Sequence, residues 1–280
     1  MHTLTIPNKG TDLFTFVYPA EHKETVILLH GGPGIPDPFR KVIEILNPHF
    51  QVLCFHQRGT GLSPCQEQDY SMSAYLSDIS CIASYFQLPK FHLFGHSWGG
   101  LYAQLYAEHC PSHLSSLFLC SPSSGMGQHW VKMEKEILRF NISASTLWEL
   151  PHLALHAFLG MLGSDNAYQR LGRIVLKNYL MAHPISVEDC PLLENIRARA
   201  INKTLQHIRA SPPIKRVNNP LFPVSVTYGD ADIYGTSTEH VRQRYPTGIF
   251  HQIEDSRHFP WLQNPKMFQK ILLGHFKGDG

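Results

Sequence analysis

Short apolar runs alternate with longer amphipathic stretches along the first 120 residues of the chain. Continuous apolar runs of strand length are typical of strands buried on both faces of a parallel sheet. The stretches between them have helical spacing, and this alternation predicts a mainly parallel sheet with helices on both faces, an α/β fold. The expected strands are at 24–29, 51–56, 90–95 and 114–120, and the expected helices are at 39–46, at 71–87 and after residue 97.

The pattern differs at the start of the chain and again after residue 120. Residues 2–18 alternate between apolar and polar positions and predict an antiparallel hairpin at the sheet edge, turning near Asn8-Lys9-Gly10. Residues 122–212 have helical segments without strand periodicity, and strands resume at 222–228 and 248–253. We therefore expect a core of residues 1–121 and 213–280 with an inserted helical cap, 122–212, over the strand ends. The alternative is that these helices pack on the side of the core.

Composition agrees with a soluble α/β enzyme and excludes some other classes. The 280 residues are 43% apolar with a formal net charge of +2, so we expect no electrostatic attraction to nucleic acid or membranes. The chain does not open with a leader pattern, and no apolar run approaches the length of a membrane span. Six cysteines show no paired spacing, and Cys54 and Cys120 lie inside apolar strand patterns. We expect buried thiols and a cytoplasmic location.

The segment Gly95-His96-Ser97-Trp98-Gly99-Gly100 follows the third expected strand and precedes a good helical sequence. Gly-x-Ser-x-Gly between a strand and a helix is typical of a nucleophile elbow, a strained turn that exposes the serine hydroxyl. Glycines flank the serine because a β-carbon there would collide with the neighbouring strand or helix. The alternative is a glycine-rich turn with an incidental serine.

An acid and a histidine each follow a later expected strand. Gly229-Asp230-Ala231-Asp232 comes after the strand at 222–228, and His258 comes after the strand at 248–253. A serine hydroxyl needs a base to take its proton, and the base needs an acid to orient it. In α/β proteins that use this chemistry, the residues follow in the chain order serine, acid, histidine. Ligands of such sheets bind at the carboxyl ends of the strands, where these residues are expected.

The first long strand ends in His30-Gly31-Gly32-Pro33-Gly34, where small residues let the backbone approach a substrate closely. Acyl transfer needs N–H donors aimed at the oxygen that becomes negative. We expect the backbone N–H groups of Gly32 and Trp98 to form this oxyanion hole. A plain Gly/Pro turn is the alternative interpretation of the loop.

Together these motifs resemble the α/β-hydrolase superfamily, and the glycine-proline loop is most similar to the prolyl aminopeptidase (proline iminopeptidase) group. The resemblance spans about 24–121 and 220–265 and implies an α/β-hydrolase fold. The motifs that carry it are His30-Gly31-Gly32-Pro33-Gly34, Gln57-Arg58-Gly59-Thr60-Gly61-Leu62-Ser63, the elbow, Gly229-x-x-Asp232, His258 and the helix Tyr75-Leu76-Ser77-Asp78-Ile79.

The resemblance implies that Ser97 is the nucleophile, His258 the general base and Asp232 the orienting acid. Asp230 is the local rival of Asp232. Three other histidines compete less well with His258, because one lies in a strand pattern, one in a helical stretch and one near the end of the chain; these are His251, His240 and His275.

The chain departs from the group at His56, His96 and Arg257, where the group usually has aspartate, glycine and glycine. These departures leave the triad intact but weaken the assignment to peptides. An aminopeptidase must bind a free ammonium, and the group's acidic cap signature cannot be aligned, although Glu134, Glu136, Glu149, Glu188 and Glu194 are available. The candidates for an apolar cap lining are Trp130, Phe140, Trp148, Phe158, Met161 and Tyr168.

The sequence thus predicts a serine hydrolase that cleaves an ester or amide bond of a small substrate through an acyl-enzyme, similar to proline iminopeptidases. The alternatives are a carboxylesterase, lipase-like enzyme or lactone hydrolase, and a binding protein of this fold with slow or no turnover. We expect a small ester, amide or short peptide as the partner, without nucleic acid, membrane span, metal or organic cofactor. His152 and His156 have helical i, i+4 spacing that two metal ligands could share, but no third ligand is evident.

Overall fold

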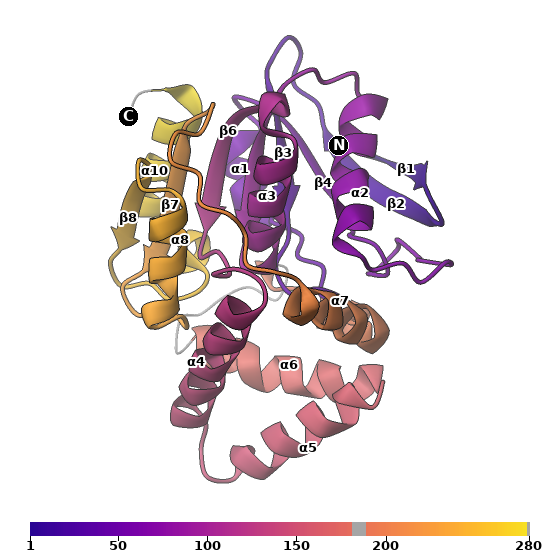
Figure 1. Ribbon diagram of the computed structural model, residues 1–280, viewed down its shortest axis with the longest axis vertical. Helices are drawn as coiled ribbons and strands as arrows, with labels where there is room; N and C mark the ends of the chain where they lie inside the picture. The colour runs from indigo at the N-terminus through magenta and orange to yellow at the C-terminus, as the bar shows by residue number, and fades with distance from the viewer. Residues whose placement is uncertain (181–188, 279–280) are drawn as a thin grey trace.

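An eight-stranded sheet forms the centre of the protein (Figure 1). The computed structural model describes residues 1–180 and 189–278. The strand order is β1-β2-β4-β3-β5-β6-β7-β8, with antiparallel pairing from β1 to β4 and parallel pairing from β4 to β8. The strands are β1 (His2–Asn8), β2 (Thr11–Tyr18), β3 (Thr25–Leu29), β4 (Gln51–Phe55), β5 (Phe91–His96), β6 (Leu114–Cys120), β7 (Val224–Gly229) and β8 (Ile249–Ile253). The predicted edge hairpin and the mainly parallel sheet are confirmed.

Helices cover both faces of the sheet, as the continuous apolar strands require. Alternate residues of β3 point to opposite sides, so that Val26 and Leu28 pack with α1, α9 and α10, whereas Ile27 and Leu29 pack with α2, α3 and α8. The helices of the two faces are α1 (Arg40–Leu46), α2 (Met72–Tyr85), α3 (Trp98–His109), α8 (Glu239–Arg244), α9 (Pro260–Gln263) and α10 (Pro265–Lys277).

Four α-helices lie in the described residues between β6 and β7 and gather beyond one end of the sheet (Figure 1). We call α4–α7 the cap helices; they are α4 (Gln128–Ala144), α5 (Glu149–Met161), α6 (Asp165–Leu180) and α7 (Ala198–Ala210). Their place in the chain is that of the predicted cap, 122–212, whose independence as a domain stays a prediction. No helix in the described ranges is both long enough and apolar enough to cross a membrane.

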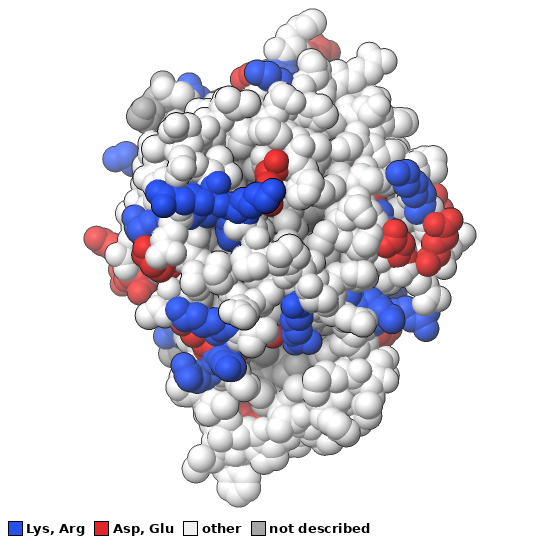
Figure 2. Space-filling view, in the orientation of Figure 1, with Lys and Arg blue, Asp and Glu red and all other residues white. Residues whose placement is uncertain are grey.

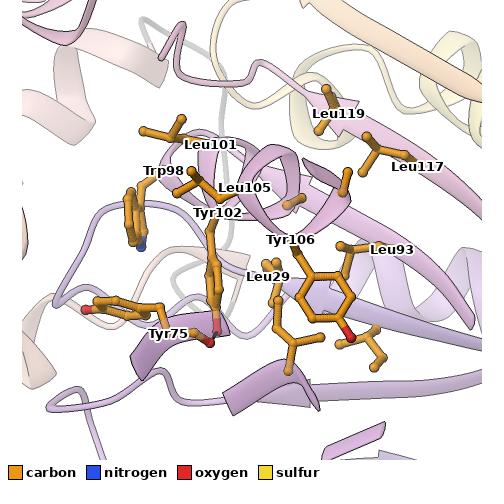
Figure 3. Packing of buried hydrophobic residues seen from close by; sticks show 14 of the residues in the cluster. Leu29, Tyr75, Leu93, Trp98, Leu101, Tyr102, Leu105, Tyr106, Leu117 and Leu119 are labelled. Carbon is orange, nitrogen blue, oxygen red and sulfur yellow. Dashed lines mark hydrogen bonds between the residues drawn. The ribbon is translucent and has the colours of Figure 1, made fainter. Parts of the chain in front are cut away.

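Helix α3 is buried along most of its length, which fixes its first turn. Trp98 stacks on Tyr102 with ring centroids 5.9 Å apart, and Tyr75 of α2 meets the edge of Trp98 at 5.3 Å (Figure 3). A β-carbon on Gly99 would collide with the backbone oxygen of Leu29, and one on Gly95 would collide with the backbone of Gly99. The two glycines therefore let the start of α3 sit against β3 and β5, as the sequence predicted.

The loop after β4 ties this region together through two buried side chains. Arg58 is fully buried and donates to both carboxylate oxygens of Asp78 on α2, at 2.8 and 2.6 Å. The side-chain amide of the preceding residue, Gln57, donates to the backbone oxygen of His30 at 2.8 Å and accepts from the indole Nε1 of Trp98 at 2.8 Å. This amide thus holds the loop after β3 against the first residue of α3.

Most described histidines are exposed or half-buried, but several are buried in the core. His30, His56 and His96 are buried, each with a backbone hydrogen-bond partner. His275 differs from the expectation, since it is not at a frayed end but lies in α10 and contacts Ser225 at 2.8 Å. A hydrogen bond offsets part of the cost of burying an imidazole, provided that the ring stays neutral.

The cysteines agree with the sequence. Cys54 and Cys120 are buried, and no disulfide joins cysteines of the described residues. A buried thiol without a partner sulfur behaves as a small apolar side chain. The cytoplasmic location stays a prediction.

The buried histidines predict a loss of stability in mild acid. Burial lowers the pKa of His30 and His275 to about 3 and that of His56 to about 4. The unfolded chain takes up protons near pH 6.5, so this stability is present above pH 6.5 and is lost as the pH falls toward 4, by about 1.4 kcal/mol per pH unit for each histidine. Urea unfolding from pH 8 to 5 measures the slope. In His275→Gln the free energy of unfolding should fall less steeply as the pH is lowered, by the contribution of one histidine. Equal slopes in the parent and the variant would contradict this account.

Gln57→Met should destabilise the protein, because it leaves the His30 carbonyl and the Trp98 indole N–H buried without partners. Two unsatisfied groups predict a loss of about 2–5 kcal/mol in the free energy of unfolding. The matched control is Gln128→Met at the exposed start of α4, expected to change stability by less than about 0.5 kcal/mol. Urea titration followed by tryptophan fluorescence compares the two, and equal stabilities would contradict a bridging role for Gln57.

Candidate active site

A cavity of about 230 Å³ lies between the sheet and the cap helices. Its floor comes from the loops that follow β3, β5, β6, β7 and β8, and its walls include Trp130, Met133 and Ile137 of α4 and Val175 and Tyr179 of α6. Ser97, His258, Gly32 and Trp98 all line it. Parallel strands bring their carboxyl ends to one edge, which is why residues far apart in sequence meet here.

Ser97 occupies the sharp turn between β5 and α3. Its backbone has φ 55° and ψ −119°, a conformation that L-residues rarely adopt. Its N–H donates to the oxygen of Cys120 at 3.1 Å, and its carbonyl accepts from the N–H of Ser123 at 2.9 Å. Contacts with the end of β6 on both sides of the residue therefore hold the strained turn and leave the side chain at the cavity.

His258 and Asp232 form a buried pair beside this turn. Nδ1 of His258 lies 3.0 Å from Oδ1 of Asp232, and both side chains are 3% exposed. Asp232 also accepts from the Ser121 hydroxyl at 2.6 Å and from the Ile233 N–H at 2.7 Å. With its carboxylate fixed in this way, Asp232 sets the orientation of the imidazole and directs Nε2 away from the pair.

The rival residues lie elsewhere. Asp230 accepts from the backbone N–H groups of Asp255 and Ser256, both at 3.1 Å, and so stabilises the loop that precedes His258. The rival histidines His251, His240 and His275 lie in β8, α8 and α10, and none of them lines the cavity. Of the sequence-predicted set, Ser97 and His258 thus line one cavity and Asp232 pairs with His258.

Two further side chains contact this group, and the sequence analysis missed both roles. Nε2 of His96 donates to the backbone oxygen of His258 at 2.9 Å, and burial lowers the pKa of His96 well below its usual range, so the ring is a neutral donor. The Tyr234 hydroxyl lies 3.1 Å from the hydroxyls of both Ser97 and Ser123. The partner of the Ser97 hydroxyl in this structure is thus the phenol.

The two expected oxyanion donors face the same cavity. Gly32 has φ +41°, and a β-carbon there would clash with the Ile35 side chain. Trp98 is the first residue of α3, where backbone N–H groups have no partner within the helix. Neither backbone N–H has a hydrogen-bond acceptor within the described part of the chain.

The cavity wall is mostly apolar. Among the described residues that line it, Asp37 alone carries a carboxylate. Burial raises the pKa of Asp37 to about 7, and one of its oxygens accepts from the Phe39 N–H at 2.8 Å. At neutral pH this carboxyl therefore carries only part of a negative charge.

The described glutamates of the cap do not line the cavity. Glu134 pairs with Arg209, Glu136 accepts from the Ser237 hydroxyl and backbone N–H, and Glu149 pairs with Lys177. Glu194 is exposed, and Glu188 lies outside the described residues. These four described glutamates thus provide no anchor for an ammonium group in the cavity.

Of the six aromatic and methionine residues considered for the lining, only Trp130 contributes. Phe140 packs on Tyr179 and Tyr168 bonds to Asn202, whereas Trp148, Phe158 and Met161 are exposed. The imidazoles of His152 and His156 lie 6.0 Å apart, and no group of three or more possible metal ligands occurs in the described ranges.

Known proteins of the same fold match both the sequence and the structure. Residues 24–144 match the family model described as alpha/beta hydrolase fold. A proline iminopeptidase from Lactiplantibacillus plantarum is 28% identical over 123 residues, which are 42% of this chain and 42% of that protein. The matched segment therefore spans about two fifths of the curated relative.

Solved structures match over nearly the whole length. The crystal structure of VinJ superposes with a TM-score of 0.71 at 17% identity and covers 99% of this chain and 98% of that one. A marine microorganism esterase gives a TM-score of 0.64 at 22% identity over 94% of this chain and 98% of that chain. This protein thus has the α/β-hydrolase fold, residues 24–144 match the family model of that fold, and part of its sequence is similar to proline iminopeptidases.

Proposed function

We propose that the protein is a serine hydrolase that cleaves an ester or amide bond of a small substrate with an uncharged, apolar acyl group. The observation that carries the proposal is the buried His258–Asp232 pair beside the strained Ser97, in one cavity. A buried carboxylate that fixes an imidazole next to an exposed hydroxyl is the arrangement that activates an alcohol.

In this mechanism the Ser97 hydroxyl turns from Tyr234 to His258 and attacks the carbonyl carbon of the substrate. Nε2 of His258 takes the hydroxyl proton while the backbone N–H groups of Gly32 and Trp98 stabilise the oxyanion. The imidazolium then gives this proton to the leaving group, and an acyl-enzyme remains on Ser97. Water attacks the acyl-enzyme, and His258 again takes a proton and returns it to Ser97 as the acid leaves.

The cavity favours an ester over a peptide with a free amino terminus. A buried ammonium without a fully charged partner loses several kcal/mol of hydration, and the lining offers only Asp37, whose pKa is raised to about 7. Apolar walls from α4 and α6 suit an acyl chain or a ring. One protein of similar structure, the marine microorganism esterase, is named for the same type of reaction.

Proline iminopeptidase activity is the second candidate, and the sequence similarity to such enzymes favours it. The segment that matches the family model includes the glycine loop and the elbow, which supply the general chemistry of attack. It ends at residue 144, before α5–α7 and the loops of Asp232 and His258. The family match therefore supports the reaction more than the substrate.

Ser97→Ala should abolish hydrolysis of p-nitrophenyl butyrate, because the variant has no group to form the acyl-enzyme. The expected loss in kcat is at least about 10⁴-fold. A fluorophosphonate should label the parent at Ser97, as located by peptide mass mapping, and should not label the variant. Circular dichroism checks that the variant is folded. Retained activity in a folded variant would end the proposal. A parent that stays unlabelled and inactive on every ester and anilide would instead favour a binding protein.

A pair of substrates separates the two candidate activities. We expect kcat/KM for p-nitrophenyl butyrate to exceed that for prolyl-p-nitroanilide by at least about 100-fold, because the anilide must desolvate an ammonium that the cavity does not pair. Asp37→Asn tests the one carboxyl in the lining, and the variant should keep its ester activity. A parent that prefers the anilide and loses this preference in Asp37→Asn would establish the aminopeptidase activity instead.

A further inference from the structure

The outer side of α5 exposes an unusual number of large apolar side chains. Within α5 only Leu153 and Gly160 are buried. We call the exposed set the α5 apolar surface; it consists of Leu147, Trp148, Leu155, Phe158, Met161 and Leu162, whose exposed fractions are 83%, 85%, 50%, 55%, 62% and 70%. A helix that is apolar on its outer side is unfavourable in water, and such a surface marks a place where something binds.

The charges on the segment that contains α4, α5 and α6 are not balanced. Between residues 128 and 180 the chain has six lysines and arginines and four acidic residues. Each of the four acids is engaged within the protein: Glu134 with Arg209, Glu136 with Ser237, Glu149 with Lys177, and Asp165 with the Ala198 N–H.

Several cations of the same region have no such partner. Lys135 and Arg139 are exposed on α4 beside the exposed Leu138 and Ile142. Arg170 of α6 is exposed and acts electrostatically on His156 of α5. None of the three cations is in an ion pair with a described residue. Figure 2 shows the resulting division, with lysines and arginines over α4 and α7 above an almost uncharged end of the cap helices.

The exposed apolar side chains of α5 and the unpaired cations of α4 and α6 together indicate the chemistry of the partner. A symmetric contact between two copies would bring the unpaired cations of both copies together, with no free acid of α4–α6 to neutralise them. An anionic lipid surface instead offers phosphates to the cations and an apolar layer to the side chains of α5. Exposed tryptophan, phenylalanine and leucine beside lysine and arginine are typical of helices that lie in such an interface.

We propose that the α5 apolar surface binds the protein peripherally to an anionic lipid membrane. Trp148 and Phe158 enter the boundary between headgroups and acyl chains, and Lys135, Arg139 and Arg170 contact lipid phosphates. The near-neutral net charge of the whole chain predicts no such attraction, because it averages over the uneven distribution of charge on the cap helices. The inference does not depend on the proposed reaction, since binding can be measured in the Ser97→Ala variant.

Vesicle flotation tests the proposal. The full chain should float with vesicles of phosphatidylcholine containing about 30% phosphatidylglycerol, and much less with phosphatidylcholine alone, and added salt should weaken the binding. Trp98, Trp130 and Trp261 are buried, so Trp148 is the exposed indole. A blue shift of tryptophan emission on binding should therefore be lost in Trp148→Phe.

Two variants and a matched control separate the contributions. Leu155→Gln with Phe158→Gln, and Lys135→Glu with Arg139→Glu, should each weaken binding by at least about tenfold. Leu221→Gln, at a position 78% exposed on the core, should leave binding unchanged. Because all these positions are exposed, thermal unfolding should show folded variants.

Three outcomes would overturn the proposal. The first is that the parent does not float with either vesicle. The second is that binding is unaffected by both double variants. The third is a dimer in sedimentation velocity that Leu155→Gln with Phe158→Gln dissociates while vesicles leave the parent unbound, which would assign the surface to a second copy.

Discussion

One buried amide holds together the two segments on which the candidate active site depends. Gln57 donates to the His30 carbonyl and accepts from the Trp98 indole, so the loop that contains Gly32 and the first turn of α3 have a fixed separation. The neighbouring Arg58 anchors the same loop to α2 through Asp78. A buried ion pair such as Arg58–Asp78 avoids a large desolvation cost only when both groups are fully hydrogen-bonded. Here the pair fixes the position of the loop that contains Gln57.

Close packing also explains the strained turn at Ser97. Its backbone strain persists because α3 is buried almost completely and because β6 holds the turn from both sides. Gly95 and Gly99 let the helix start close to β3, and larger residues would separate the hydroxyl from the segments around it. The chemistry proposed for the site therefore rests on packing well below the cavity.

Much of the core could be predicted from the sequence, because the apolar runs are short, continuous and followed by glycines or charged residues. The order of Ser97, Asp232 and His258 was also accessible, since strand ends meet at one edge. The resemblance favoured Asp232 over Asp230, and the coordinates show the physical difference, because Asp232 pairs with His258 whereas Asp230 accepts from the backbone of the loop before it. The roles of His96 and Tyr234 were not accessible, since their partners lie 162 and 137 residues away and no local pattern records them. The exposed side chains of α5 are candidates for the cavity lining from the sequence alone, because helical spacing does not show which face of a helix faces the cavity.

The bond between Ser97 and Tyr234 has a consequence for the protein at rest. A phenol whose pKa is raised by burial keeps its proton at neutral pH and accepts protons poorly, so an alcohol bonded to it stays an ordinary alcohol. In the proposed mechanism, reactivity begins only when an incoming molecule displaces this pairing and frees the oxygen to rotate.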